Sequence, residues 1–260
     1  MIGKWLTRLL RRNVGSVYLY GMLRSTLLFA QWAARRPDEP DLLFLARLPQ
    51  RDDELVLDIG ANGGQSAVAL GYIRPRARII SFEPLAPLWS ELARVKLLLG
   101  RRFQFRRYGL GNEAGSFQLF VPISGELAMT TRASISHEAA AANCRELEIA
   151  VGLATRIDTV EIEVRRGDEE LCIPLAIKID VEGAEFQVLQ GLRQTIVQHR
   201  PAVLLEKSGS FDDCAGFFRE LGFDILTGEQ SEHGSLLLPG LSNRNWIACP
   251  PELTRSLQSD

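Results

Sequence analysis

Short apolar runs that end in a glycine or an acid alternate along this chain with longer segments of helical periodicity. Leu55–Ile59 is such a run, interrupted only by Asp58 and followed by Gly60. A run of this length closed by a glycine predicts a buried strand of a parallel sheet. A helix-compatible segment begins at Gln65, so the local order is strand, glycine turn and helix. In an open α/β sheet such a turn lies at the carboxyl edge, where ligands bind.

The same alternation continues through the chain. Further strands are predicted at residues 78–82, 103–108, 116–121, 146–151, 175–179, 202–205, 223–226 and 245–248. Helices are predicted at residues 41–48, 87–99, 157–160, 182–198 and 212–221. Residues 122–142 are too long for a plain connection and predict a lid or binding loop, and residues 252–260 predict a frayed tail. Strands that alternate with helices indicate a parallel sheet with right-handed crossovers.

Residues 1–40 differ in composition from the rest, and Pro37 to Pro40 mark a break, so we expect a helical appendage over 1–40 and one domain over 41–260. Residues 1–36 carry a net charge of +7 and no acid, which leaves −9 for the remainder. On a helical projection, one face of residues 1–12 carries Ile2, Trp5, Leu6, Leu9 and Leu10, and the other Lys4, Arg8, Arg11 and Arg12.

Three interpretations of this appendage stay open. Its apolar stretch is interrupted by Arg24 and by polar residues, which disfavours a membrane-spanning helix. A pair of helices that pack on the body and roof the active site is favoured over a basic amphipathic helix at a membrane surface. An arginine-rich organelle presequence is the least favoured of the three.

Composition narrows the class of protein. The four cysteines are scattered without a C-x-x-C pair, which argues against a zinc site or a disulfide framework and favours a reducing compartment. The acidic body is a poor match for nucleic acid. We therefore expect a cytoplasmic protein, with membrane association through residues 1–36 as the alternative, and no nucleic-acid partner.

The glycine turn indicates the kind of ligand. A nicotinamide fingerprint would carry G-x-G-x-x-G, but Asn62 stands at its second glycine. Asp58, two residues before Gly60, would repel a pyrophosphate. It suits a phosphate-free ligand with a cationic end, such as S-adenosylmethionine, which carries an ammonium and a sulfonium. The alternative is a strand, turn and helix with a packing role only.

Four predicted strands end in an acid, namely Asp58, Glu83, Asp180 and Glu206. Parallel strands present their carboxyl ends at one edge, and unpaired acids are costly to bury, so this edge needs partners or a cationic ligand. Glu83 follows the glycine turn by about 20 residues, the spacing of a ribose-binding acid. Asp180 and Glu182 could hold the ligand's amino group, orient an acceptor hydroxyl, bind a divalent cation or cap a helix. No metal is predicted.

Five segments occur in order that together resemble the FkbM-type methyltransferases. They are LVLDIGANGGQSA, SFEP, TRIDTV, IKIDVEGAEFQVLQG and RPAVLLE. These enzymes use S-adenosylmethionine and mostly methylate hydroxyl groups of glycans or polyketides. The resemblance implies a doubly wound, seven-stranded and mostly parallel α/β sheet of the Rossmann-like kind, with its last strand antiparallel.

The resemblance also implies a set of site residues. The expected cofactor contacts are Asp58, Gly60, Ala61, Asn62, Gly63, Ser66, Glu83, Pro84, Asn112 and Asp180. A hydroxyl acceptor loses a proton, and the candidate bases are His137, Asp180 and Glu182. We therefore expect an S-adenosylmethionine-dependent O-methyltransferase that acts on a hydroxyl of a glycan or a polyketide-like small molecule. A non-catalytic binding or scaffold protein is the alternative, and a nicotinamide oxidoreductase is less favoured.

Overall fold

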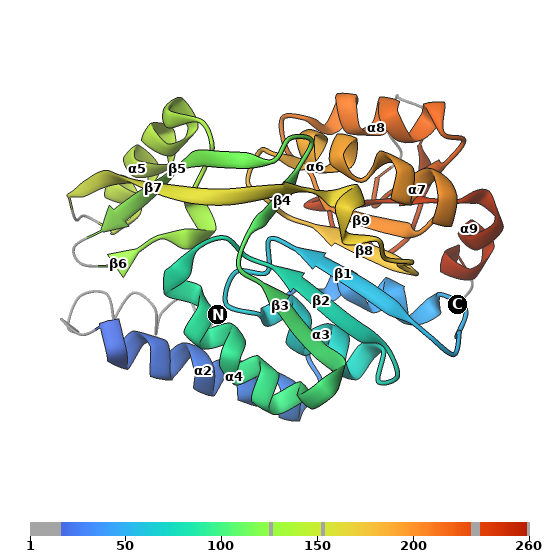
Figure 1. Ribbon diagram of the computed structural model, residues 1–260, viewed down its shortest axis with the longest axis horizontal. Helices are drawn as coiled ribbons and strands as arrows, with labels where there is room; N and C mark the ends of the chain where they lie inside the picture. Colours follow the sequence, from blue (N-terminus) through green and yellow to red (C-terminus); the bar gives the residue numbers. More distant parts are fainter. Residues whose placement is uncertain (1–16, 125–126, 152–153, 230–234, 259–260) are drawn as a thin grey trace.

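A computed structural model of the protein describes residues 17–124, 127–151, 154–229 and 235–258. Its centre is an eight-stranded sheet with the order β11-β10-β12-β9-β8-β1-β2-β3 (Figure 1). The strands are β1 (Leu55–Ile59), β2 (Arg78–Phe82), β3 (Phe103–Arg106), β8 (Ala176–Ile179), β9 (Ala202–Glu206), β10 (Asp224–Thr227), β11 (Leu236–Leu237) and β12 (Asn245–Cys249). Only β12 runs antiparallel to its neighbours. The predicted doubly wound, mostly parallel sheet with an antiparallel last strand is confirmed, but the predicted count of seven is wrong because the two-residue β11 pairs with β10.

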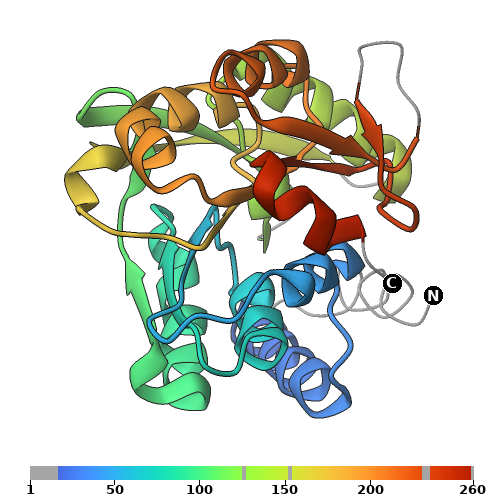
Figure 2. The same ribbon diagram turned by 90° about the vertical axis from the view of Figure 1, so that its right-hand side faces the viewer.

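Helices cover both faces of this sheet, because its strands are apolar on both sides (Figure 2). One core cluster joins Val56 and Ile79 to η1, α3, α4 and α9, and the other joins Leu57 and Ile177 to α6, α7 and α8. These helices are η1 (Pro40–Arg47), α3 (Gln65–Ile73), α4 (Trp89–Leu99), α6 (Glu185–Gly191), α7 (Arg193–His199), α8 (Phe211–Glu220) and α9 (Pro251–Gln258). Three short 3₁₀ helices lie in the connections, namely η2 (Ala86–Leu88), η3 (Gly100–Arg102) and η5 (Gly167–Glu170).

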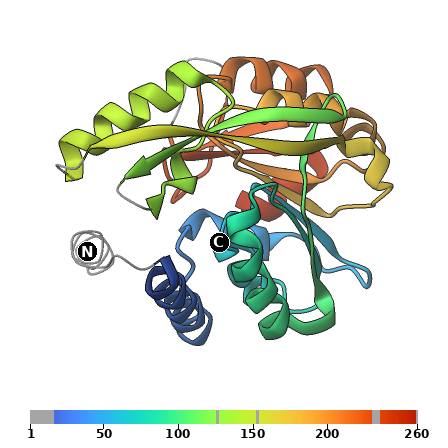
Figure 3. The same ribbon diagram turned by 60° about the vertical axis from the view of Figure 1, so that its left-hand side comes forward.

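A second, four-stranded sheet lies across the carboxyl edge of the first, with α5 (His137–Val151) on its outer side (Figure 3). It has the order β4-β7-β5-β6, where β4 is Gly109–Gly111, β5 is Gly115–Ser124, β6 is Leu127–Ala128 and β7 is Thr155–Arg166. A short 3₁₀ helix, η4 (Thr130–Arg132), precedes α5. The inward face of this second sheet carries Leu119, Ile162 and the apolar residues around them, which pack on Leu85 and Leu88.

The structure corrects three sequence predictions in this region. Residues 146–151 are helical, because Ala140, Cys144 and Leu147 recur at helical spacing and are buried on one face of α5. Residues 157–160 belong to β7, which pairs along its whole length with β5. The predicted loop at 122–142 therefore contains the end of β5, all of β6 and η4, and the start of α5.

Two terminal segments are also better defined than the sequence suggested. Residues 251–258 form α9 instead of a frayed tail, since Leu253 and Leu257 lie in the core. Helix α2 (Val17–Ala34) packs on α3 and α4 through the buried Leu28. The predicted amphipathic helix at residues 1–12 lies outside the described residues, and the domain boundary at residue 40 stays a prediction. Among the residues that the structure describes, no helix combines the length and apolar character that crossing a bilayer requires.

Candidate functional site

The chain changes direction across the sheet between β1 and β8, and the site lies just beyond their ends. From β1 the chain adds β2 and β3 on one side, and from β8 it adds β9 on the other. A switch point of this kind leaves a crevice for ligands at the carboxyl edge. The N–H of Asp180 donates to Ile59 O at 3.0 Å, so the two strand ends are joined here. Gly60 has φ +80°, and a Cβ on it would lie 1.8 Å from Asp180 O, so the position accepts only glycine.

The carboxylate of Glu83, at the end of β2, holds the glycine turn. Its Oε2 accepts the N–H of Asn62 at 2.8 Å, and its Oε1 accepts the N–H of Leu85 at 2.9 Å. Asn62 sits in the left-handed region with φ +48°, where asparagine is tolerated. Burial raises the pKa of Glu83 to about 7, although the two N–H donors oppose the rise. Each carboxylate oxygen keeps a lone pair for a further donor.

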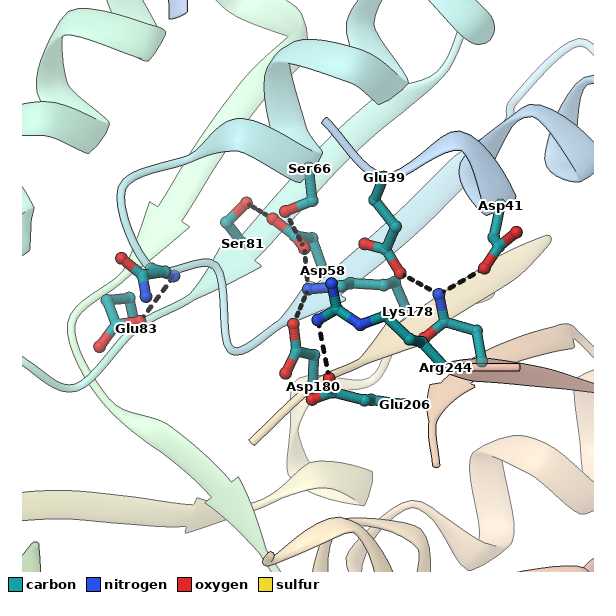
Figure 4. Close-up of polar contacts among 12 residues, drawn as sticks. Glu39, Asp41, Asp58, Ser66, Ser81, Glu83, Lys178, Asp180, Glu206 and Arg244 are labelled. Carbon is teal, nitrogen blue, oxygen red and sulfur yellow. Dashed lines mark hydrogen bonds and ion pairs between the residues drawn. The ribbon is translucent and has the colours of Figure 1, made fainter. Parts of the chain in front are cut away.

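Asp58 lies beneath the turn and is fully buried. Its two neighbours in the sheet register are Ser81 and Lys178, so all three side chains point to the same face. Asp58 Oδ1 accepts the hydroxyl of Ser66 at 2.7 Å, and Oδ2 accepts the hydroxyl of Ser81 at 2.6 Å (Figure 4). Lys178 Nζ lies 4.0 Å from Asp58 Oδ1. Asp58 therefore supports the turn from below and is not among the residues that line the cavity.

Lys178 is a buried lysine between two acids. Its Nζ donates to Asp180 Oδ2 at 3.0 Å, in addition to facing Asp58 (Figure 4). Burial alone would lower the pKa of Lys178, but the carboxylates of Asp180, Asp58 and Glu39 raise it, so the lysine stays charged. Burial would raise the pKa of Asp180, but the charge and hydrogen bond of Lys178 act together with Glu206 and Arg244, and the pKa lies below the ordinary value.

Asp180, Glu182 and Glu206 gather three carboxylates around one point, with oxygens within 4.8 Å of one another. Burial and then the charges of Asp180 and Glu206 raise the pKa of Glu182 to about 8. Burial and then the charge and hydrogen bond of Asp180 raise the pKa of Glu206 to about 7. Arg244 opposes this rise, with its Nη2 lying 3.1 Å from Glu206 Oε1. Three oxygen ligands could hold a divalent cation, but Lys178 and Arg244 already pair with two of the three acids.

The segment that follows α2 closes one end of the site. Asn245 donates through Nδ2 to Glu39 Oε1 and to Asp41 Oδ2, each at 2.7 Å. Ser242 donates its hydroxyl and its N–H to Asp41 as well. Burial raises the pKa of Glu39. No local pattern could predict these contacts, because the partners lie about two hundred residues apart in the chain.

These elements surround one cavity of about 480 Å³. Nine predicted site residues line it, namely Gly60, Ala61, Asn62, Ser66, Glu83, Pro84, Asn112, Asp180 and Glu182. The opposite wall comes from the second sheet and includes Phe117, Leu119, Ile162 and Val164. Sequence reasoning missed this wall, although the alternation of apolar residues in β5 and β7 was a signal for it.

Three predicted site residues do not line this cavity. Asp58 is buried beneath the turn, Gly63 belongs to the turn but is not part of the cavity wall, and His137 lies at the exposed start of α5. The ring of His137 packs edge-on against Phe120, with 5.1 Å between centroids. Phe120 alternates with Leu119 along β5, so His137 faces the side of the second sheet opposite to the cavity. Of the three candidate bases, Asp180 and Glu182 therefore line the cavity and His137 does not.

Comparisons with known proteins found several similar sequences and structures. AMB antimetabolite synthetase AmbE from Pseudomonas aeruginosa is 27% identical over 242 residues, which span 79% of this chain but only 11% of that protein. Methyltransferase sdnD from Sordaria araneosa is 26% identical over 205 residues, spanning 70% of this chain and 77% of that protein. The crystal structure of Methyltransferase FkbM from Methylobacillus flagellatus KT is 19% identical, with a TM-score of 0.49, and the match covers 77% of this chain and 44% of that chain.

A family model matches more than half of the chain. A model described as the methyltransferase FkbM domain matches residues 58–225. This span begins at Asp58 under the glycine turn and includes Glu83, Asp180, Glu182 and Glu206, the acids gathered at the carboxyl edge. The chain therefore belongs to the FkbM methyltransferase family.

Proposed function

We propose that this protein is an S-adenosylmethionine-dependent O-methyltransferase whose acceptor is a hydroxyl group on a small molecule with an apolar body. One observation carries the proposal: the glycine turn, the ribose-type acid Glu83 and the pair Asp180 and Glu182 line the same cavity. On this proposal, one side of the cavity holds a nucleoside, and the acids Asp180 and Glu182 line the other side.

The chemistry of the lining residues fits this donor better than a dinucleotide. Among the described residues that line the cavity, the two bases are Lys178 and Arg244, and each is paired with an acid. None of these described basic side chains is thus left to neutralise a pyrophosphate. A phosphate-free nucleoside with an ammonium and a sulfonium group suits the acidic edge instead.

Each part of the site has a role in this proposal. S-adenosylmethionine supplies a methyl group that is already electrophilic, so the protein mainly aligns the donor with the acceptor. Glu83 would accept the ribose hydroxyls with the lone pairs that its two N–H donors leave free. Asp180, kept charged by Lys178, would face the cationic end of the donor. Glu182 would take the proton of the acceptor hydroxyl.

The wall formed by the second sheet favours an apolar acceptor. Phe117, Leu119 and Ile162 face the cavity with carbon only, whereas a sugar has hydroxyl groups all round that need polar partners. A polyketide-like alcohol fits this wall better than a glycan. One of the relatives above is named as the synthetase of an antimetabolite, which is in keeping with a small-molecule product.

Calorimetry and methyl transfer test the proposal in two steps. First, titration with S-adenosylmethionine should show one binding site, with NADH as the negative control. Second, cell extract is incubated with the protein and methyl-labelled donor and is then partitioned between organic and aqueous phases. The label should enter the organic phase and resist alkali, because a methyl ether is stable in base whereas a methyl ester releases methanol.

Substitution separates binding from chemistry. Glu182→Gln should leave the affinity for S-adenosylmethionine within about twofold and lower the transfer rate by about 10²-fold or more, the range expected for a lost base. Glu138→Gln, on the exposed start of α5, is the matched control. A protein that fails to bind the donor is a scaffold, and label confined to the aqueous phase would assign a glycan or another polar acceptor.

A further inference from the structure

We propose that α2 docks this protein on the surface of an anionic membrane, with Phe29 and Trp32 inserted among the lipid headgroups. The proposal concerns a part of the molecule that the methyl-transfer site does not use. None of the residues of α2 lines the cavity. It therefore stands or falls independently of the proposed function.

The first observation is an exposed aromatic pair on a helix that is otherwise anchored. Leu28 is 6% exposed and joins the core, which holds α2 against α3 and α4. Phe29 and Trp32 are 58% and 38% exposed, and their ring centroids lie 6.0 Å apart. They are three positions apart on the helix, so they share a face. Large aromatic side chains are favoured at membrane interfaces, where the ring meets the boundary between headgroups and acyl chains.

The second observation is the charge around this pair. Arg35 and Arg36 are exposed and follow α2 directly. Residues 1–36 carry +7 without a single acid, while the rest of the chain carries −9. An anionic lipid surface attracts the first segment and repels the second, so the two charges together orient the protein with α2 toward the bilayer. The sequence of residues 1–12, with apolar and basic residues at helical spacing, extends the same pattern.

An anionic membrane explains this surface better than a second copy of the chain. A two-fold contact would bring the same basic segment from both copies together, and like charges would oppose it. A membrane-spanning attachment is not available to the described helices. The segment after α2 lines the cavity from Asp38 onward, four residues beyond Ala34, so docking would hold the cavity edge within about 14 Å of the membrane-bound helix end.

Vesicle co-sedimentation of the full chain tests the proposal. The probe is a vesicle of neutral phosphatidylcholine, compared with one in which about one lipid in three is phosphatidylserine. The parent protein should sediment with the anionic vesicles and remain in solution with the neutral ones. Phe29→Ser with Trp32→Ser should weaken binding by about tenfold or more, because it removes two apolar side chains from the interface. Arg35→Gln with Arg36→Gln should weaken it by about fivefold for each charge.

The matched control is Ile149→Ser on α5, an apolar side chain that is 87% exposed elsewhere on the surface, and it should bind like the parent. The arginine variant keeps the test decisive if the aromatic variant fails to fold. Equal vesicle binding by the parent, the aromatic variant and the arginine variant would overturn the proposal. A parent protein that does not sediment with anionic vesicles would also overturn it. Sedimentation velocity without lipid gives the remaining outcome. If the parent is a dimer and the aromatic variant is a monomer, this face contacts a second copy and the proposal is overturned.

Discussion

Lys178 Nζ lies 3.0 Å from Asp180 Oδ2, and both residues stand at the end of β8, where the sheet switches direction. The same ammonium group lies 4.0 Å from Asp58 Oδ1, beneath the glycine turn. One buried cation therefore serves two acids, one that lines the cavity and one that supports its floor. This relationship links the stability of the sheet edge to the charge of the site.

Lys178→Met should destabilise the protein strongly. The change leaves two neighbouring carboxylates without their cation in a buried position, and breaking a buried pair in this way costs about 3–5 kcal/mol. The free energy of unfolding from urea denaturation measures the effect. The double variant Lys178→Met with Asp180→Asn is the control, since it removes one of the stranded charges and should recover part of the loss. A single variant within about 1 kcal/mol of the parent would show that the lysine is not needed to balance these acids.

Glu83→Gln should weaken binding of S-adenosylmethionine by about tenfold or more, because one hydrogen bond to a charged group is lost or reversed. The amide can accept from only one of the two N–H groups of Asn62 and Leu85 and presents its own NH₂ to the other. Titration calorimetry gives the affinity, and Glu138→Gln on α5 is again the control. Unchanged affinity in the Glu83 variant would remove Glu83 from the binding site.

The raised pKa of Glu182, about 8, makes both activity and stability depend on pH. As the base, Glu182 must be deprotonated, so the transfer rate should rise with pH up to about 8 and then level. The stability of the folded protein should change in the opposite direction and fall as pH rises. The folded protein binds the proton more tightly than the unfolded chain, whose carboxyl has the ordinary value of 4.5, so this contribution is fully present below pH 4.5 and is lost as pH rises through about 8.

The transfer rate measured between pH 5 and about 9 gives the first trend, and thermal melts of the protein without donor over the same range give the second. Glu83 and Glu206, whose pKa values are raised to about 7, add to the loss of stability in the same window. Glu182→Gln should flatten the upper part of the melting trend and remove the rise in rate. A parent rate that is flat from pH 6 to about 9 would exclude Glu182 as the base.

Chelation should leave methyl transfer unchanged. Lys178 and Arg244 pair with Asp180 and Glu206 at 3.0 Å and 3.1 Å, so two of the three carboxylates that could bind a cation already have partners. The measurement is the transfer rate before and after treatment with EDTA. A rate that falls with EDTA and returns with Mg²⁺ would instead identify Asp180, Glu182 and Glu206 as ligands.

Local pattern was sufficient for the elements nearest the turn. Leu55–Ile59 formed the expected strand, because an apolar run closed by glycine has few other buried conformations. Glu83 follows β2 and accepts the N–H of Asn62 in the turn, and its role toward the ribose stays a prediction. Residues 146–151 form part of α5 and not the predicted strand, because a short apolar run fits a strand and a buried helix equally well.

The amino-acid sequence by itself thus determined the order of strands and helices, the glycine turn and the presence of acids at the strand ends. Only the tertiary structure decided which acid lies in the cavity and which lies below it, because that depends on the register that sets Asp58 between Ser81 and Lys178. The tertiary structure also supplied the apolar wall from the second sheet and the contacts of Asn245 with Glu39 and Asp41. These contacts join distant parts of the chain, and local periodicity carries no information about them.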